Sequence, residues 1–98
     1  MPIATSQQEQ EFTITLDEKF NFDSVEQFRE AYTDKNAETY IVDFRATEYM
    51  DSSGLGMLLN MRRYLTEKNI STIKLINCRP QIKKVLIISR FESKFIIA

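Results

Sequence analysis

Histidine and tryptophan are absent from the 98 residues, and cysteine occurs once, at Cys78. Without histidine, the chain has no Ser-His or Cys-His catalytic pair and no histidine metal site. A single cysteine forms neither an internal disulfide nor a multi-cysteine metal cluster, and this usage fits a reducing cytoplasm. We therefore expect a cytoplasmic protein without metal, cofactor or catalytic activity. We interpret Cys78 as a small buried hydrophobe rather than a redox site.

Long apolar runs and a large excess of one charge are also missing. The longest apolar candidates, "VLII" and "FIIA", are far shorter than the roughly 18 residues that cross a bilayer, and the N-terminal "MPIATSQQEQE" does not resemble a signal peptide. With 13 basic and 14 acidic residues and a net charge of −1, we expect no strong field for nucleic acid or acidic lipid. Five basic residues are interpreted as solvated helix faces, with a basic patch for an acidic partner as the alternative: Arg62, Arg63, Arg79, Lys83 and Lys84.

The composition that remains, 43% hydrophobic and 28% charged, is typical of one soluble domain. Alternating or compact apolar runs predict strands at 12–16, 39–44 and 72–77 and a short strand at 19–22. Residues 94–98 would form either a last edge strand or a tethered tail. Residues 39–44 have the pattern of a central strand covered on both faces. Residues 1–11 are expected to be a flexible N-terminal tail.

Helical spacing predicts three helices between these strands. Asp23 would cap the first, with Glu26 closing a capping box, and the second would run from Ser52 to about Lys68. Pro80 suits the first turn of the third. The order predicts an α/β fold with a mixed, mostly parallel central sheet of four to five strands and three to four helices packed on it, over a single domain at 1–98.

The junction "MDSSGLGML" at 50–58 contains both glycines of the chain, Gly54 and Gly56. Glycine in a helix costs about 1 kcal/mol relative to alanine, which indicates a tight turn, close packing or an approaching backbone. Asp51, Ser52 and Ser53 are all good N-cap types, so helix capping and a modifiable or recognised serine are both open interpretations. No phosphate-binding loop and no nucleophile elbow is present.

The segment "YIVDFRATEYMDSSGLGMLLNMRRYL" is similar to the signature of bacterial anti-sigma factor antagonists, the STAS domains. In that family an apolar strand leads through an Asp-Ser-Ser/Thr-Gly-Leu-Gly turn into a helix. The later "IKLINCRPQIKKVLIISRF" resembles the strand and helix that follow. The likeness covers roughly residues 12–97 and is most specific at 50–57.

The resemblance implies a partner-switching role in transcription regulation and signal transduction. It implies that Ser52 is phosphorylated, with Ser53 as second choice, by a GHKL-type serine kinase that is often itself the anti-sigma factor. A PP2C-type serine phosphatase would restore the free hydroxyl, and only the unphosphorylated form would bind the kinase tightly. The partner-binding residues would be Asp51, Ser52, Ser53, Gly54, Leu55, Gly56 and Met57.

Two alternatives remain at this point. The first keeps the fold but makes the chain a STAS regulatory subunit of a transporter, a lipid-transport complex or a stress-sensing complex, and this subunit would never be phosphorylated. The second is a small enzyme with Ser52 as nucleophile, for which the sequence offers no histidine base.

Overall fold

The computed structural model describes residues 3–98 and contains a five-stranded mixed sheet. In spatial order its strands are β1 (Ala4–Gln8), β2 (Glu11–Thr15), β4 (Thr39–Asp43), β6 (Thr72–Ile76) and β7 (Ile96–Ile97). β1 pairs antiparallel with β2, and the later pairs are all parallel. The predicted mixed, mostly parallel sheet is confirmed.

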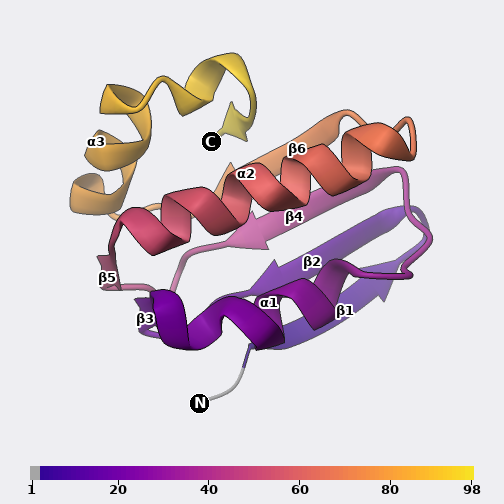
Figure 1. Ribbon diagram of the computed structural model, residues 1–98, viewed down its shortest axis with the longest axis horizontal. Helices are drawn as coiled ribbons and strands as arrows, with labels where there is room; N and C mark the ends of the chain where they lie inside the picture. Colours follow the sequence, from indigo (N-terminus) through magenta and orange to yellow (C-terminus); the bar gives the residue numbers. More distant parts are fainter. Residues whose placement is uncertain (1–2) are drawn as a thin grey trace.

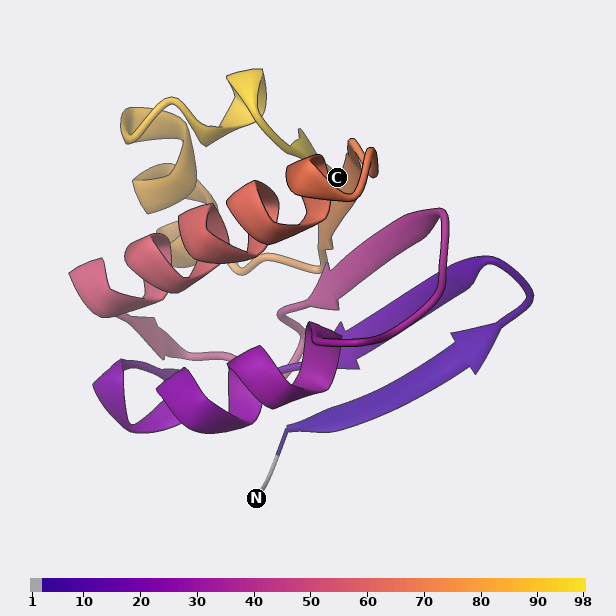
Figure 2. The same ribbon diagram turned by 45° about the vertical axis from the view of Figure 1, so that its right-hand side comes forward.

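Three α-helices connect or follow the parallel strands: α1 (Val25–Tyr32), α2 (Ser52–Glu67) and α3 (Pro80–Ile88), with short 3₁₀ turns η1 (Phe22–Ser24) and η2 (Phe91–Ser93). α1 and α2 lie side by side over one face of the sheet, and α3 lies beyond α2 (Figures 1 and 2). Asn69, just after α2, has a φ of 65°, the left-handed conformation that often ends a helix. Within residues 3–98, no helix has the length and apolar character needed to cross a bilayer.

The hydrophobic core lies between the sheet and the helices. The sheet contributes Phe12, Ile14, Leu16, Tyr40, Val42, Ile73 and Leu75, and the helices contribute Phe28, Tyr32, Leu58, Met61, Leu65, Ile82 and Leu86. Along β4, Tyr40 and Val42 are buried, whereas Thr39 and Ile41 on the other face are only half-buried. The prediction that β4 is covered on both faces is wrong, because α1 and α2 cover only the face of Tyr40 and Val42.

The N-terminal segment also differs from the expected tail. Residues Ala4–Gln8 pair as β1 along β2, from Ala4 opposite Thr15 to Gln8 opposite Glu11. The tail prediction is therefore wrong for these residues, while residues 1 and 2 lie outside the described residues. All five β1 side chains are exposed, so backbone hydrogen bonds rather than burial hold the strand in place. Such a strand carries no apolar pattern that sequence reasoning could detect.

The first helix begins differently from the prediction. Neither Asp23 nor Glu26 takes the predicted capping role. The 3₁₀ turn η1 comes first and is capped by Asn21, whose side chain accepts a 3.0 Å hydrogen bond from the amide of Asp23, and Ser24 is the N-cap residue of α1 without a side-chain cap bond. Ser24 completes the capping box by accepting from the Asn21 amide. The cap differs from the prediction because the 3₁₀ turn η1 precedes α1 and includes Asp23 as its middle residue.

Candidate functional site

Two short strands place the starts of two helices next to each other. β3 (Lys19–Phe20) and β5 (Tyr49–Met50) form a separate parallel pair, with Lys19 opposite Tyr49 and Phe20 opposite Met50. β3 leads into η1 and α1, and β5 leads into α2 (Figure 1). Since the pairing is parallel, Phe22 and Ser52, each two residues beyond its strand, come to the same edge.

Backbone hydrogen bonds hold β5 in this position. The amides of Glu48 and Tyr49 both donate to the carbonyl oxygen of Glu18, at 2.8 and 3.1 Å. The buried Thr47 donates its hydroxyl to the carbonyl oxygen of Asp17 at 2.9 Å. The segment between β4 and α2, which leads into the "DSSGLG" turn, is therefore held against the segment between β2 and α1, which contains β3.

Asp51 is the N-cap of α2. Its Oδ1 accepts hydrogen bonds from the amides of Ser53 and Gly54, at 2.9 and 3.3 Å. Its carbonyl oxygen accepts from the amides of Gly54 and Leu55. Of the three possible N-cap residues, the structure selects Asp51, so neither Ser52 nor Ser53 is needed to cap the helix.

Ser52 occupies the first residue of α2 and is exposed, while Ser53 is half-buried. Ser52 makes no side-chain hydrogen bond to any residue in the described range 3–98. Its hydroxyl is therefore free to accept a modifying group without breaking a contact of the fold. Ser53 lies closer to the packed side of the helix and is less accessible.

The burial of Gly54 explains why glycine occurs at this position. A Cβ atom at this position would lie 2.5 Å from Cγ of Met50 and 2.9 Å from the carbonyl oxygen of Phe20. The first turn of α2 therefore packs directly on the β3–β5 pair, and only glycine fits. Gly54 supports the site from beneath, although the sequence placed it among the partner contacts.

Gly56 is exposed, and a Cβ atom there would meet nothing within 4 Å. Nothing in the described part of the chain requires glycine at this position, and glycine inside a helix costs about 1 kcal/mol relative to alanine. The backbone of α2 is therefore uncovered at Gly56, one turn beyond Ser52.

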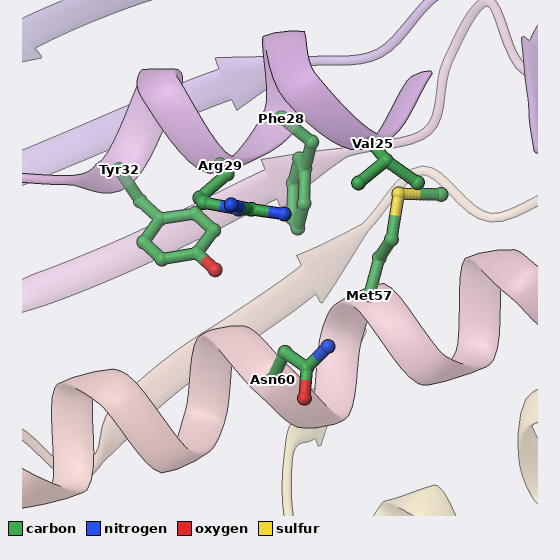
Figure 3. A pocket seen from close by; sticks show the side chains of 6 residues that line it. All are labelled: Val25, Phe28, Arg29, Tyr32, Met57 and Asn60. Atoms are coloured by element: carbon green, nitrogen blue, oxygen red, sulfur yellow. The ribbon is translucent and has the colours of Figure 1, made fainter. Parts of the chain in front are cut away.

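Met57 also proves to be mainly structural. It is only 6% exposed, and Figure 3 shows its side chain reaching from α2 toward Val25 in the small pocket between α1 and α2. The lining of this pocket is completed by Phe28, Arg29, Tyr32 and Asn60. Leu55 is half-buried at the edge of the core, so of the last three predicted contact residues Gly56 is the most open.

Two exposed aromatic side chains near Ser52 were missed by sequence reasoning. Phe22 is 74% exposed at the start of η1, and Tyr49 is 51% exposed on β5. Aromatic side chains are enriched at the centres of protein interfaces relative to the rest of the protein surface. The pairing of β3 with β5, which no sequence pattern gives, is what brings Phe22 to the same edge as Ser52.

A buried carboxylate anchors the end of β4. Asp43 is 1% exposed and accepts hydrogen bonds from the backbone and guanidinium of Arg45 and from the side-chain amide of Asn77. The Arg45–Asp43 ion pair measures 2.7 Å. Burial pushes the pKa of Asp43 upward, but these donors outweigh it and hold the pKa below its usual value. The network fixes the connection between β4 and β5.

Comparisons with known proteins agree with this geometry. The family model described as "Mlab, STAS domain" matches residues 3–97. The STAS-domain containing protein PA14_20770 of Pseudomonas aeruginosa (strain UCBPP-PA14) is 44% identical over an aligned length of 92 residues, and the match covers 91% of this chain and 89% of that protein.

Solved structures are similar over nearly the whole chain. The anti-sigma factor antagonist SpoIIAA in its unphosphorylated form is 25% identical, with a TM-score of 0.74 over 98% of this chain and 86% of that one. The Bacillus cell fate determinant SpoIIAA in its phosphorylated form gives 25% identity and a TM-score of 0.73 over 98% and 90%. An anti-sigma-factor antagonist (STAS) domain protein from Planctomyces limnophilus shares the fold at a TM-score of 0.84 and 17% identity, over 99% and 89%.

Proposed function

The chain belongs to the STAS domain family, and from that premise we propose that it is a protein-binding module switched by phosphorylation of Ser52. The unphosphorylated form binds a GHKL-type serine kinase that acts as an anti-sigma factor, and phosphorylation releases it. A PP2C-type serine phosphatase resets the switch. The module is cytoplasmic and non-enzymatic, and it acts in transcription regulation.

One observation carries the proposal: Ser52 is exposed at the first residue of α2, while Asp51 alone caps the helix. A kinase reaches this hydroxyl without unfolding the domain. The likeness to SpoIIAA, solved in unphosphorylated and phosphorylated forms with nearly equal TM-scores of 0.74 and 0.73, supports a modification that leaves the fold intact.

The switch acts through surface charge. A phosphoserine carries nearly two negative charges, and the Asp51 carboxylate already occupies the amides of Ser53 and Gly54. The phosphate therefore gains little from the helix start and stays in solvent beside a like charge. Two like charges about 4 Å apart repel by about 1 kcal/mol in water and about 4 kcal/mol at a protein surface.

Binding at this surface requires water to be removed from it. The exposed Phe22 and Tyr49 are the anchors that a partner would cover, with bare Gly56 allowing close approach of its backbone. Covering a dianion in the middle of such a surface costs several kcal/mol unless the partner supplies compensating charge. Phosphorylation therefore lowers affinity by orders of magnitude without refolding the domain.

The test uses purified GHKL-type kinases of the source organism, ATP and intact-mass measurement. We expect one added phosphate on wild type and on the matched control Ser53→Ala, and none on Ser52→Ala. Calorimetric titration should give similar kinase affinity for wild type and Ser52→Ala and at least about tenfold weaker affinity for Ser52→Asp. Phosphate on Ser52→Ala, or no phosphate on any variant, contradicts the proposed switch.

The same surface supports a second candidate, a STAS subunit that docks in a transporter, lipid-transport or stress-sensing complex without phosphorylation. The exposed Phe22 and Tyr49 favour it, because aromatic anchors serve a permanent interface equally well. Loss of partner capture by Phe22→Ser, combined with absence of phosphate on wild type from cells, would select this candidate.

A further inference from the structure

The small net charge conceals a strong separation of charge along the chain. Residues 1–51 contain 12 of the 14 acidic residues and 4 of the 13 basic ones, whereas residues 52–98 contain 2 acidic and 9 basic residues. The two halves therefore carry net charges of −8 and +7. The near-zero net charge is therefore the sum of an acidic N-terminal half and a basic C-terminal half.

The outer face of α3 is basic at its start and apolar at its end. Arg79, Lys83 and Lys84 are exposed, and no acidic residue occurs between Arg79 and Arg90. Ile87 and Ile88 are 41% and 70% exposed at the end of the helix. Cations at a helix start oppose the helix dipole, so this arrangement does not favour α3 in isolation.

The outer face of α1 has the opposite character. Glu26 and Glu30 are exposed one turn apart, which is a repulsive spacing within one helix. Phe22, one turn before Glu26 and 74% exposed, extends the row at its apolar end. Arg29, the one cation of α1, lines the pocket between α1 and α2 (Figure 3) and is also exposed beside Glu26 and Glu30.

The two rows match in spacing as well as in charge. The α1 row is Phe22, in the η1 turn before the helix, followed by Glu26 and Glu30 on α1, and the α3 row read backwards is Ile87, Lys83 and the N-cap residue Arg79. Members of both rows are four residues apart, which is about 6 Å for the pairs that lie within α1 and α3. An antiparallel arrangement therefore places phenylalanine on isoleucine and both glutamates on cations, whereas a parallel arrangement places phenylalanine on arginine and glutamate on isoleucine.

Within one molecule the rows do not meet. α1 and α3 lie on opposite sides of α2 (Figures 1 and 2). We propose that the chain associates with a second copy of itself, the α1 row of one copy packing antiparallel on the α3 row of the other. Charge complementarity within this one sequence identifies the occupant, because each copy carries both halves of the contact.

The inference goes beyond the proposed function but touches its site. Phe22 belongs both to the α1 row and to the edge that carries Ser52. Self-association therefore covers an anchor of the partner surface, and copies joined in this way compete with the partner for Phe22.

The test is sedimentation velocity of the full chain over a range of concentrations, at about 50 mM and about 500 mM salt. We expect a sedimentation coefficient that rises with concentration at low salt, and a self-association constant at least about tenfold weaker at high salt, where charges are screened. Lys83→Glu with Arg79→Glu, and separately Glu26→Lys with Glu30→Lys, should each weaken self-association at least about tenfold.

A four-fold charge reversal separates this contact from a general charge effect. In each double variant, the α1 row and the α3 row carry charges of the same sign. When all four substitutions are combined in one chain, the two rows again carry opposite charges, so association should be restored. As a matched control, Arg62→Glu with Arg63→Glu changes the net charge equally on α2 and should leave the association near wild type.

Several outcomes would overturn the proposal: a concentration-independent monomer at low salt, an equal loss in the α2 control, or failure of the four-fold reversal to restore association. Binding of a monomeric wild type to phosphatidylglycerol vesicles, lost in Lys83→Glu with Arg79→Glu, would assign the α3 face to an anionic membrane instead. Circular dichroism of each variant reports whether its fold is retained. None of these variants touches Ser52, so the phosphorylation test stands or fails separately.

Discussion

A methyl group at Gly54 would lie 2.9 Å from the carbonyl oxygen of Phe20, an atom of the backbone that has no freedom to move aside. This contact joins the start of α2 to β3. It makes Gly54 part of the support of the serine turn, whereas Gly56, two residues on, faces open space.

The Gly54→Ala substitution should destabilise the domain by about 1–3 kcal/mol, because overpacking forces α2 away from the β3–β5 pair. Urea unfolding followed by circular dichroism measures the change. An unchanged midpoint would mean that the first turn of α2 is free to shift.

The Gly56→Ala substitution should raise the stability of the isolated domain by about 0.5–1 kcal/mol, because alanine has the higher helix propensity and meets no neighbour. Under the proposed function it should also weaken partner binding. A gain in stability with unchanged kinase affinity would remove Gly56 from the partner surface.

The Asp51→Ala substitution should cost about 1 kcal/mol, since the amides of Ser53 and Gly54 lose their acceptor. Asp51→Asn keeps an acceptor oxygen, so it should cost only a few tenths of that energy. Chemical denaturation of both variants checks the order, and an equal loss in the two would indicate that charge rather than hydrogen bonding stabilises the helix start.

The Asp43→Asn substitution should destabilise the protein by about 2 kcal/mol at about pH 7, because Arg45 and Asn77 lose a buried ionised acceptor. The pKa of Asp43 in the folded state is below the usual 3.8, so its ionised form contributes stability above that value. This contribution is lost as the pH falls through the folded pKa. The free energy of unfolding of wild type and Asp43→Asn should be measured at about pH 7 and about pH 3, and the difference between the two proteins should be smaller at about pH 3. An equal difference at both pH values would contradict a stabilising role for the ionised Asp43 carboxylate.

Cys78 should react slowly with thiol reagents at neutral pH. Burial raises the pKa of its thiol to about 11, so almost none of the reactive thiolate exists near neutrality. The rate of alkylation by iodoacetamide, compared with the same protein unfolded in urea, measures this protection. Equal rates in the folded and unfolded states would show the thiol to be open to solvent.

Local pattern was sufficient for the elements with strong periodicity. The run at 39–44, the helix from Ser52 and the proline at position 80 were placed correctly, because alternation, helical spacing and the fixed φ of proline act within a few residues. Segments stabilised from a distance were placed less well. The exposed β1 depends on its backbone pairing with β2, and the position of Asn21 as cap depends on the 3₁₀ turn that precedes α1.

The sequence by itself determined that an α/β fold forms and that a helix begins at the "DSSGLG" turn, since both depend only on residue types and their spacing. Tertiary structure decided which of the junction residues support the turn and which face outward. The pairing of β3 with β5 buries Gly54 and brings Phe22 to the same edge as Ser52, and the position of α2 separates the acidic α1 from the basic α3. These relationships join residues about thirty or more positions apart, and only packing of the whole chain fixes distances of that kind.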